Sequence, residues 1–192
     1  MPRLTDVQKD ERRERILDGA RRCFARQGYE AATVVRLEEE IGLSRGAIFN
    51  WFPSKEELFI AVAARENERL LQVFTEEGVE GLLGAMLRDD PDWLAVYLEF
   101  GRRLRTDPDL RERWTSTSPD ARARSRAWIA AGQKAGRLRN DVSAREIAQF
   151  LGVILDGIAA QRALGFDAPD AGLLHRLTTD AIGTQERVSS SS

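Results

Sequence analysis

The residues of this chain whose types and spacing could do chemistry lie in its N-terminal third. Arg45, Gly46 and Ala47 follow Ser44 and open a short segment with helical apolar spacing. An arginine in the first turn of a helix can read the O6 and N7 atoms of guanine with two hydrogen bonds. Glycine and alanine beside it are small enough to let the helix backbone approach base edges. The segment therefore predicts a recognition helix that enters the major groove of DNA with its N-terminus first.

Side chains that could hold phosphate groups flank this helix. Thr33 stands at the start of the preceding short helix, where free backbone N–H groups and the hydroxyl can bind a phosphate. Lys55 stands at the start of the following helix and suits the same role. Asn50 and Trp51 come after the reading turn and suit contacts to phosphates and sugars. The complete predicted DNA-binding set is Thr33, Arg36, Ser44, Arg45, Gly46, Ala47, Asn50, Trp51 and Lys55.

Three helices must position these side chains. The segment 8–28 carries apolar residues at i, i+4, i+7 and i+8 on one face. Two short segments follow, 34–40 and 45–51, with Gly42 in the tight turn between them, and this arrangement predicts a helix-turn-helix. The expected N-caps are Thr33, Ser44 and Ser54, the last in a capping box with Glu57 at the start of a long helix.

The rest of the chain also has helical patterning. The six prolines lie between periodic stretches, and no stretch alternates apolar and polar residues as a strand would. Further helices are expected near 79–88, 92–106, 109–115, 119–135, 143–164 and 170–184. The fold class is therefore all-α, with a three-helix unit at 1–52, a helical bundle at 53–188 and a disordered tail at 189–192.

Charge alone does not indicate a nucleic-acid binder. The chain of 192 residues has a formal net charge of −2, and residues 1–60 hold eleven Lys or Arg against eleven Asp or Glu. The run Glu38-Glu39-Glu40 must therefore face away from DNA if the helix-turn-helix binds it.

Composition excludes several other classes. With one cysteine and one histidine, His175, the chain has no intramolecular disulfide, no His/Cys zinc site and little material for a catalytic triad. No apolar run approaches the length of about 18 residues that a membrane span needs. The charged N-terminus has no secretory apolar region. These counts favour a cytoplasmic protein that is not a hydrolase, and we expect no membrane partner, no cofactor and no metal.

The predicted helix-turn-helix and the helices around it resemble the N-terminal region of the TetR family of bacterial transcriptional regulators. The resemblance covers about residues 16–59 and is carried by Ile16-Leu17, Ala20, Phe24, Gly28-Tyr29, Thr33, Gly42, Ser44, Gly46, Ile48-Phe49, Phe52 and Ser54-Lys55-Glu56-Glu57-Leu58. It implies an N-terminal DNA-binding domain and a C-terminal domain for ligand binding and dimerisation. It also implies a repressor that binds a short inverted repeat as a homodimer and leaves it when a small molecule binds.

Two details refine this resemblance. The family usually has Tyr where Phe49 stands, and Tyr or His at positions 50 and 51, although Asn50 and Trp51 can still donate hydrogen bonds. Short stretches such as Ser44–Phe49 and Leu104–Pro108 are also similar to the aconitase-repressor branch. That narrower resemblance implies citrate with a divalent metal such as Mg²⁺ as the effector.

The bundle holds candidate residues for the effector. Trp93, Tyr97 and Phe100 form an aromatic stripe that could be core or pocket lining. Arg122 and Arg126 are four residues apart on one helix face, so they could be solvated or could turn inward to bind a carboxylate. The predicted ligand-binding set is therefore Trp93, Tyr97, Phe100, Arg122 and Arg126.

The last two helices are candidates for a dimer interface. Segment 147–164 is too apolar for a lone surface helix, and an ordinary buried core is the alternative to an interface. The family resemblance favours pairing with a second copy across a two-fold axis. The predicted interface residues are Phe150, Leu151, Ile154, Leu155, Ile158, Leu174 and Leu177.

Two functions of other classes remain open from the residues alone. Glu99, Asp156 and Asp180 could supply carboxylates to a helical enzyme, although they lack the Glu-x-x-His pattern of a di-iron bundle. The apolar face within 147–182 could instead bind a different protein. Turnover without DNA binding would support the first function, and a stable heteromer without a homodimer would support the second.

Overall fold

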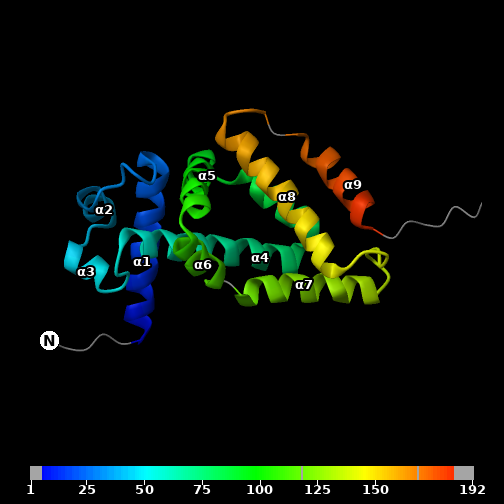
Figure 1. The fold of residues 1–192 in the computed structure, drawn as a ribbon, viewed down its shortest axis with the longest axis horizontal. Coiled ribbons are helices and arrows are strands. Elements are labelled where there is room, and N and C mark those ends of the chain that lie inside the picture. The colour runs from blue at the N-terminus through cyan, green and yellow to red at the C-terminus, as the bar shows by residue number, and fades with distance from the viewer. Residues whose placement is uncertain (1–5, 118, 168, 184–192) are drawn as a thin grey trace, which may run out of the picture.

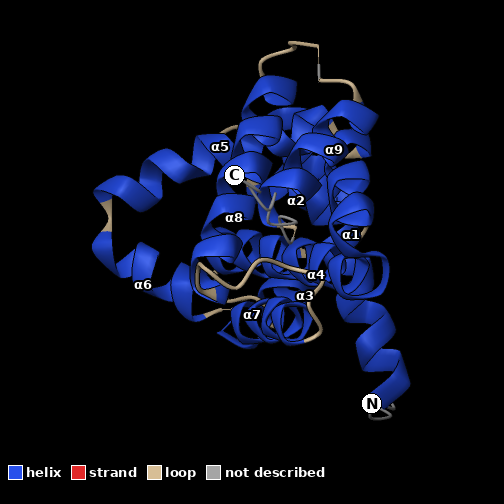
Figure 2. Cartoon of the chain, turned by 90° about the vertical axis from the view of Figure 1, so that its right-hand side faces the viewer, coloured by secondary structure: helices blue, strands red, loops and turns tan. Residues whose placement is uncertain are grey.

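The computed structural model describes residues 6–117, 119–167 and 169–183, and within these ranges α-helices are joined by loops and turns (Figures 1 and 2). The predicted disordered tail lies outside them. The helices are α1 (Asp6–Gln27), α2 (Val34–Ile41), α3 (Arg45–Phe49), α4 (Lys55–Arg88), α5 (Pro91–Thr106), α6 (Pro108–Ser116), α7 (Pro119–Lys134), α8 (Ala144–Ala163) and α9 (Ala171–Ile182). No β-strand forms in the described part of the chain, which confirms the all-α fold class.

Local sequence signals set the limits of the first helices. The Thr33 hydroxyl accepts a hydrogen bond from the backbone N–H of Arg36 and caps α2. Gly42 ends α2 in the left-handed region, with φ at 69°, where glycine has no steric penalty. Ser44 has the extended backbone of an N-cap, but its side chain makes no capping hydrogen bond. The predicted cap at Ser44 is therefore only partly realised.

The long helix α4 joins the three-helix unit to the bundle. The Ser54 hydroxyl caps it by accepting from the backbone N–H of Glu57 at 3.1 Å. At Gly78 the backbone leaves the helical region, with φ at 72° and ψ at −158°, and α4 kinks where the sequence predicts one helix to end and the next to begin. The indole Nε1 of Trp128 donates to the Thr75 carbonyl at 3.2 Å, so the kinked backbone has a partner from α7.

The three-helix unit lies at one end of the molecule and α8 and α9 lie toward the other, with α4 running between them (Figure 1). Helix α5 packs against both α1 and α8, and α4 contacts α7, α8 and α9. One buried apolar cluster extends from α1 to α9. The predicted domain boundary at 52/53 therefore falls inside a continuous core.

An aromatic cluster holds the three-helix unit to the bundle, and we call it the aromatic joint. The Phe59 ring of α4 lies 5.1 Å from Phe24, 5.2 Å from Tyr29 and 4.3 Å from Phe100, centroid to centroid. Its other members are Trp93 of α5 and Trp114 of α6, with centroids 5.5 Å and 6.4 Å from that of Phe59. Edge-to-face aromatic pairs add to the free energy gained from burial alone.

Candidate nucleic-acid interface and effector pocket

The start of α3 presents small and charged groups on its outer side. Arg45 and Gly46 are exposed, whereas Ile48 on the opposite side is buried and fixes the helix to α1 and α2. The Arg45 guanidinium lies 6.0 Å from the centroid of the Phe49 ring. A Cβ atom at Gly46 would meet no atom within 4 Å, so nothing inside the chain requires glycine there. A helical glycine is destabilising by about 0.5–1 kcal/mol relative to alanine, which fits a position shaped by an outside partner.

Two side chains of the predicted DNA-binding set also support the loop between α1 and α2. Arg36 donates to the Gln27 side chain at 2.6 Å and to the Ala31 carbonyl at 3.1 Å. The Lys55 ammonium donates to the Tyr29 carbonyl at 2.9 Å and lies 4.5 Å from the Tyr29 ring centroid. Each cation is thus held beside the loop that leads to Thr33. Of the remaining predicted set, Thr33, Ser44 and Asn50 are exposed, and Ala47 and Trp51 are half-buried.

The acidic run does not face away from α3 as a whole. Glu40 pairs with Arg22 at 2.8 Å and with Arg26 at 2.9 Å, both on α1, so its charge is neutralised within the unit. Glu38 differs, because its carboxylate accepts the backbone N–H of Arg45 at the first residue of α3. Glu38 thus occupies an N–H group that a phosphate could otherwise have bound, and the orientation of the run relative to DNA stays a prediction.

The turn before Thr33 is held by a residue that sequence reasoning treated as a possible catalytic carboxylate. Glu99 of α5 accepts from the backbone N–H of Tyr29 at 3.0 Å and of Glu30 at 3.4 Å. Burial raises the pKa of the Tyr29 hydroxyl to about 12, and Glu56 adds to the rise while Arg103 opposes it. Glu99 therefore positions the helix-turn-helix, and no sequence signal connects residues 70 positions apart.

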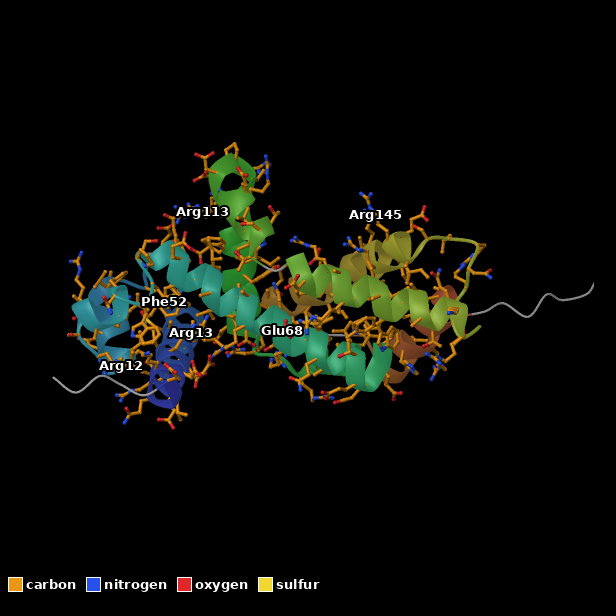
Figure 3. The ribbon with its side chains drawn as sticks, turned by 90° about the horizontal axis from the view of Figure 1, so that it is seen from below. Arg12, Arg13, Phe52, Glu68, Arg113 and Arg145 are labelled. Atoms are coloured by element: carbon orange, nitrogen blue, oxygen red, sulfur yellow. The ribbon has the colours of Figure 1, made fainter. Side chains whose placement is uncertain are left out.

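A cavity of about 510 Å³ lies between α4, α7 and α8. Arg122 and Arg126 of α7 and Arg145 of α8 lie along it, and Figure 3 shows Arg145 beside the ribbons of α7 and α8. Its apolar lining residues include Leu70, Leu71, Phe74, Leu82, Leu151 and Leu155. No Asp or Glu is among its lining residues, so the charged side chains that line the cavity are all positive and the others include many apolar ones.

The predicted aromatic stripe does not line this cavity as a unit. Trp93 and Phe100 are buried in the aromatic joint, because α5 turns them toward Phe59. Tyr97 is half-buried against Trp114. Burial raises the pKa of Tyr97, and nearby Asp156 raises it further while Arg122 lowers it. Of the predicted ligand-binding set, Arg122 and Arg126 line the cavity, whereas Trp93 and Phe100 take the core alternative that the sequence left open; Arg145 was not predicted.

Helices α8 and α9 each carry exposed apolar side chains, and the predicted interface residues differ in how far they are exposed. Leu151 and Ile158 are buried within the protomer because this stripe of α8 packs inward, whereas Ile154, Leu155 and Leu174 are half-buried. Val153 is 70% exposed and Leu177 is 59% exposed. We define the outer face as Phe150, Val153, Leu173 and Leu177. Val153 could have been found from its i+3 spacing to Phe150.

Other functions that depend on metals or membranes gain no support from the described residues. No group of three His, Cys, Asp or Glu side chains among them could hold a metal ion. No helix in the described ranges is long and apolar enough to cross a membrane.

The helical fold and the exposed start of α3 define a helix-turn-helix regulator with a helical ligand-binding bundle. Residues 16–62 match the model for bacterial regulatory proteins of the tetR family, and residues 75–185 match the model for the BetI-type transcriptional repressor C-terminal region. The chain belongs to the TetR family. It is a transcriptional repressor of this family and not an enzyme.

Known proteins agree with the family resemblance. The chain is 43% identical to the HTH-type transcriptional repressor Rv1474c of Mycobacterium tuberculosis over 87% of this chain and 90% of that protein. It is 42% identical to the HTH-type transcriptional repressor AcnR of Corynebacterium efficiens over 80% and 82% of the two chains. Among solved structures it is similar to Salmonella enterica GusR, with a TM-score of 0.70, 27% identity and coverage of 93% and 98%.

Proposed function

We propose that this repressor binds a palindromic DNA operator as a homodimer and is released from it by a small organic anion. The observation that carries the DNA-binding part is the start of α3, where exposed Arg45 stands beside a glycine that no internal contact requires. We assign base reading to Arg45 and close backbone approach to Gly46 and Ala47. Thr33, Arg36, Ser44, Asn50, Trp51 and Lys55 would supply phosphate and sugar contacts.

The outer face of α8 and α9 supports the homodimer. Exposed apolar side chains on both helices are poorly solvated by water, and a two-fold axis would bury those of each copy against the other. A dimer would place two α3 helices about 34–36 Å apart, or a multiple of that spacing, on one side of the DNA. The helix-turn-helix and the bundle would then act as the DNA-binding and ligand-binding domains predicted from the sequence.

The cavity between α4, α7 and α8 supports an anionic effector. Its three arginines are exposed at its edge and can bind carboxylates with paired hydrogen bonds, beside the apolar residues of its lining. Citrate with Mg²⁺ is the first candidate to test. Because no acidic side chain lines the cavity, citrate itself would have to supply the carboxylate ligands for the metal. An effector acts only if it binds better to the form of the dimer that cannot bind DNA.

The test is selection of bound sequences from a random DNA pool, followed by titration of the selected DNA at two salt concentrations. We expect an inverted repeat and a steep loss of affinity with salt, because several phosphates are neutralised. Sedimentation of the free chain should give a mass near twice 21.6 kDa. Failure to enrich any sequence, or a stable complex with another protein and no homodimer, would overturn the proposal.

The matched variant is Arg45→Ala, selected and titrated in the same way. We expect base preference to relax at one position of each half-site, with a loss of about 1–3 kcal/mol of binding free energy there. An equal loss on every DNA sequence would instead assign Arg45 to a phosphate. Citrate with Mg²⁺, citrate alone and Mg²⁺ alone are then tested for release of the selected DNA.

A further inference from the structure

Four charged side chains form a closed ring where α1, α4 and the turn before α5 meet. Arg21 of α1 contacts Glu66 at 3.3 Å and Asp89 at 2.9 Å. Arg69 of α4 contacts the other oxygens of the same two carboxylates, Glu66 at 3.1 Å and Asp89 at 3.0 Å. Positive and negative groups thus alternate around the ring, which we call the ionic joint. It lines a groove of about 390 Å³.

Asp89 is the member of the ionic joint that also contacts α8. Its side chain is 6% exposed and faces the two arginines, while its backbone carbonyl accepts a hydrogen bond from Arg162 at 2.8 Å. Arg162 lies at the C-terminal end of α8, and the N-terminal half of α8 lines the effector cavity. One helix therefore connects the cavity to Asp89, and Asp89 connects that helix to α1.

Arg162 is held in an incompletely satisfied position. Its Nε atom is buried and has no hydrogen-bond partner among the described residues. No carboxylate of the described chain lies within 4.0 Å of its guanidinium. An unpartnered buried donor raises the free energy of the arrangement that contains it. A small displacement of α8 that gave Nε a partner would therefore be favoured locally and opposed by the bond to Asp89.

We propose that Asp89 is a positioning residue that relays displacement of α8 to α1, and so to the helix-turn-helix. The inference rests on the proposed ligand-controlled DNA binding. In the observed arrangement Arg162 fixes the Asp89 carbonyl, Asp89 fixes Arg21, and α1 keeps one orientation relative to the bundle. When α8 shifts, the ionic joint exchanges partners and this one attachment of α1 to the bundle is altered, because ion pairs between flexible side chains have more than one arrangement.

A double-mutant cycle on affinity for the selected DNA tests the relay. Arg162→Gln and Asp89→Asn should each lower the affinity about tenfold, within the usual range of coupling between sites. The double variant should lose no more than either single variant, because both act through one residue. Additive losses, or no loss from Arg162→Gln, would overturn the relay.

Two further variants keep the test decisive. Arg124→Gln breaks the pair between Arg124 of α7 and Glu68 of α4, which includes no residue of α1, and should leave the affinity within about twofold. Figure 3 shows Glu68 on α4, away from Arg12 and Arg13 of α1. If Asp89→Asn fails to fold, Arg21→Lys replaces it, since an ammonium keeps the charge but cannot bridge two carboxylates in the same geometry. Arg21→Lys should then reproduce the loss and the absence of additivity.

A readout without DNA separates this inference from the proposed function. Spin labels at Glu11→Cys on α1 and Ala130→Cys on α7 report the distance between the two units, while native Cys23 is buried. Labelled chain is diluted with unlabelled chain so that only distances within one protomer contribute. Arg162→Gln should broaden or shift the distribution of distances between the two spin labels. When it is combined with Asp89→Asn, the distribution should be the same as for Asp89→Asn alone. An unchanged distribution would overturn the relay even if the DNA selection succeeds, and a changed one would support it even if the selection fails.

Discussion

The three-helix unit is attached to the bundle by two joints of opposite chemistry. In the aromatic joint, Tyr29, Phe59 and Phe100 are buried and their ring centroids lie 4.3–5.2 Å apart. In the ionic joint, Asp89 is 6% exposed, whereas the Arg69 side chain is 45% exposed beside a groove. The aromatic joint excludes water, whereas the ionic joint is partly accessible to it.

This difference gives the two joints different mechanical properties. Close-packed rings lose dispersion contacts on any separation and have no alternative partners, so the aromatic joint resists displacement. Exposed or half-exposed ion pairs have small net free energies and can be exchanged for water or for another pair. We infer that the aromatic joint acts as the fixed pivot of the three-helix unit and the ionic joint as its adjustable side.

The largest predicted effect is on the pivot. Phe100→Ala should lower the free energy of unfolding by about 3–5 kcal/mol, because the ring is fully buried among other rings and leaves a cavity. Urea denaturation measures the loss. Leu98→Ala on the same helix is the control, since Leu98 is 39% exposed and should change stability by no more than about 0.5 kcal/mol. A loss below about 1 kcal/mol for Phe100→Ala would mean that the aromatic joint can relax and is not a pivot.

A smaller effect is expected where α5 holds the turn beside that pivot. Glu99→Ala removes the acceptor of the Tyr29 and Glu30 backbone N–H groups and should cost about 1–2 kcal/mol of unfolding free energy, since the Tyr29 donor is only partly reached by water. Glu99→Gln keeps one acceptor oxygen and should recover part of the loss. Equal losses in the two variants would assign the effect to the carboxylate charge rather than to the hydrogen bonds.

The sequence predicts the ends of the helices better than it predicts the contacts between distant helices. Thr33, Gly42 and Ser54 act within three or four residues of their own positions, and short-range capping chemistry predicts them. Gly78 and the helix-starting prolines 91, 108 and 119 likewise mark changes of direction locally. The contacts of Glu99 with Tyr29 and of Asp89 with Arg21 join residues about seventy positions apart, and no periodicity encodes such partners.

The candidate sites show the same limit. Helical spacing in the sequence places Arg122 and Arg126 on one face, and the structure puts both at the cavity. Helical spacing cannot indicate that Arg145, from another helix, lies there too. In α8 the apolar residues form an inward stripe with Leu151 and Ile158 and an outer face with Phe150 and Val153. A sequence shows that both are apolar, but the packing of α8 on α5 decides which stripe is buried.

The smallest predicted effect separates the joints by salt. Raising NaCl from 0.1 M to 1 M shortens the Debye length from about 10 Å to about 3 Å, which weakens partly exposed ion pairs and leaves ring packing intact. The unfolding free energies of the wild type and Asp89→Asn should therefore approach each other by about 0.5–1 kcal/mol in 1 M NaCl. The gap between the wild type and Phe100→Ala should not shrink, and this comparison cancels the general effect of salt on apolar burial. A gap for Asp89→Asn that does not change with salt would mean that the ionic joint is as closed to water as the aromatic one, and α1 would then have no adjustable side.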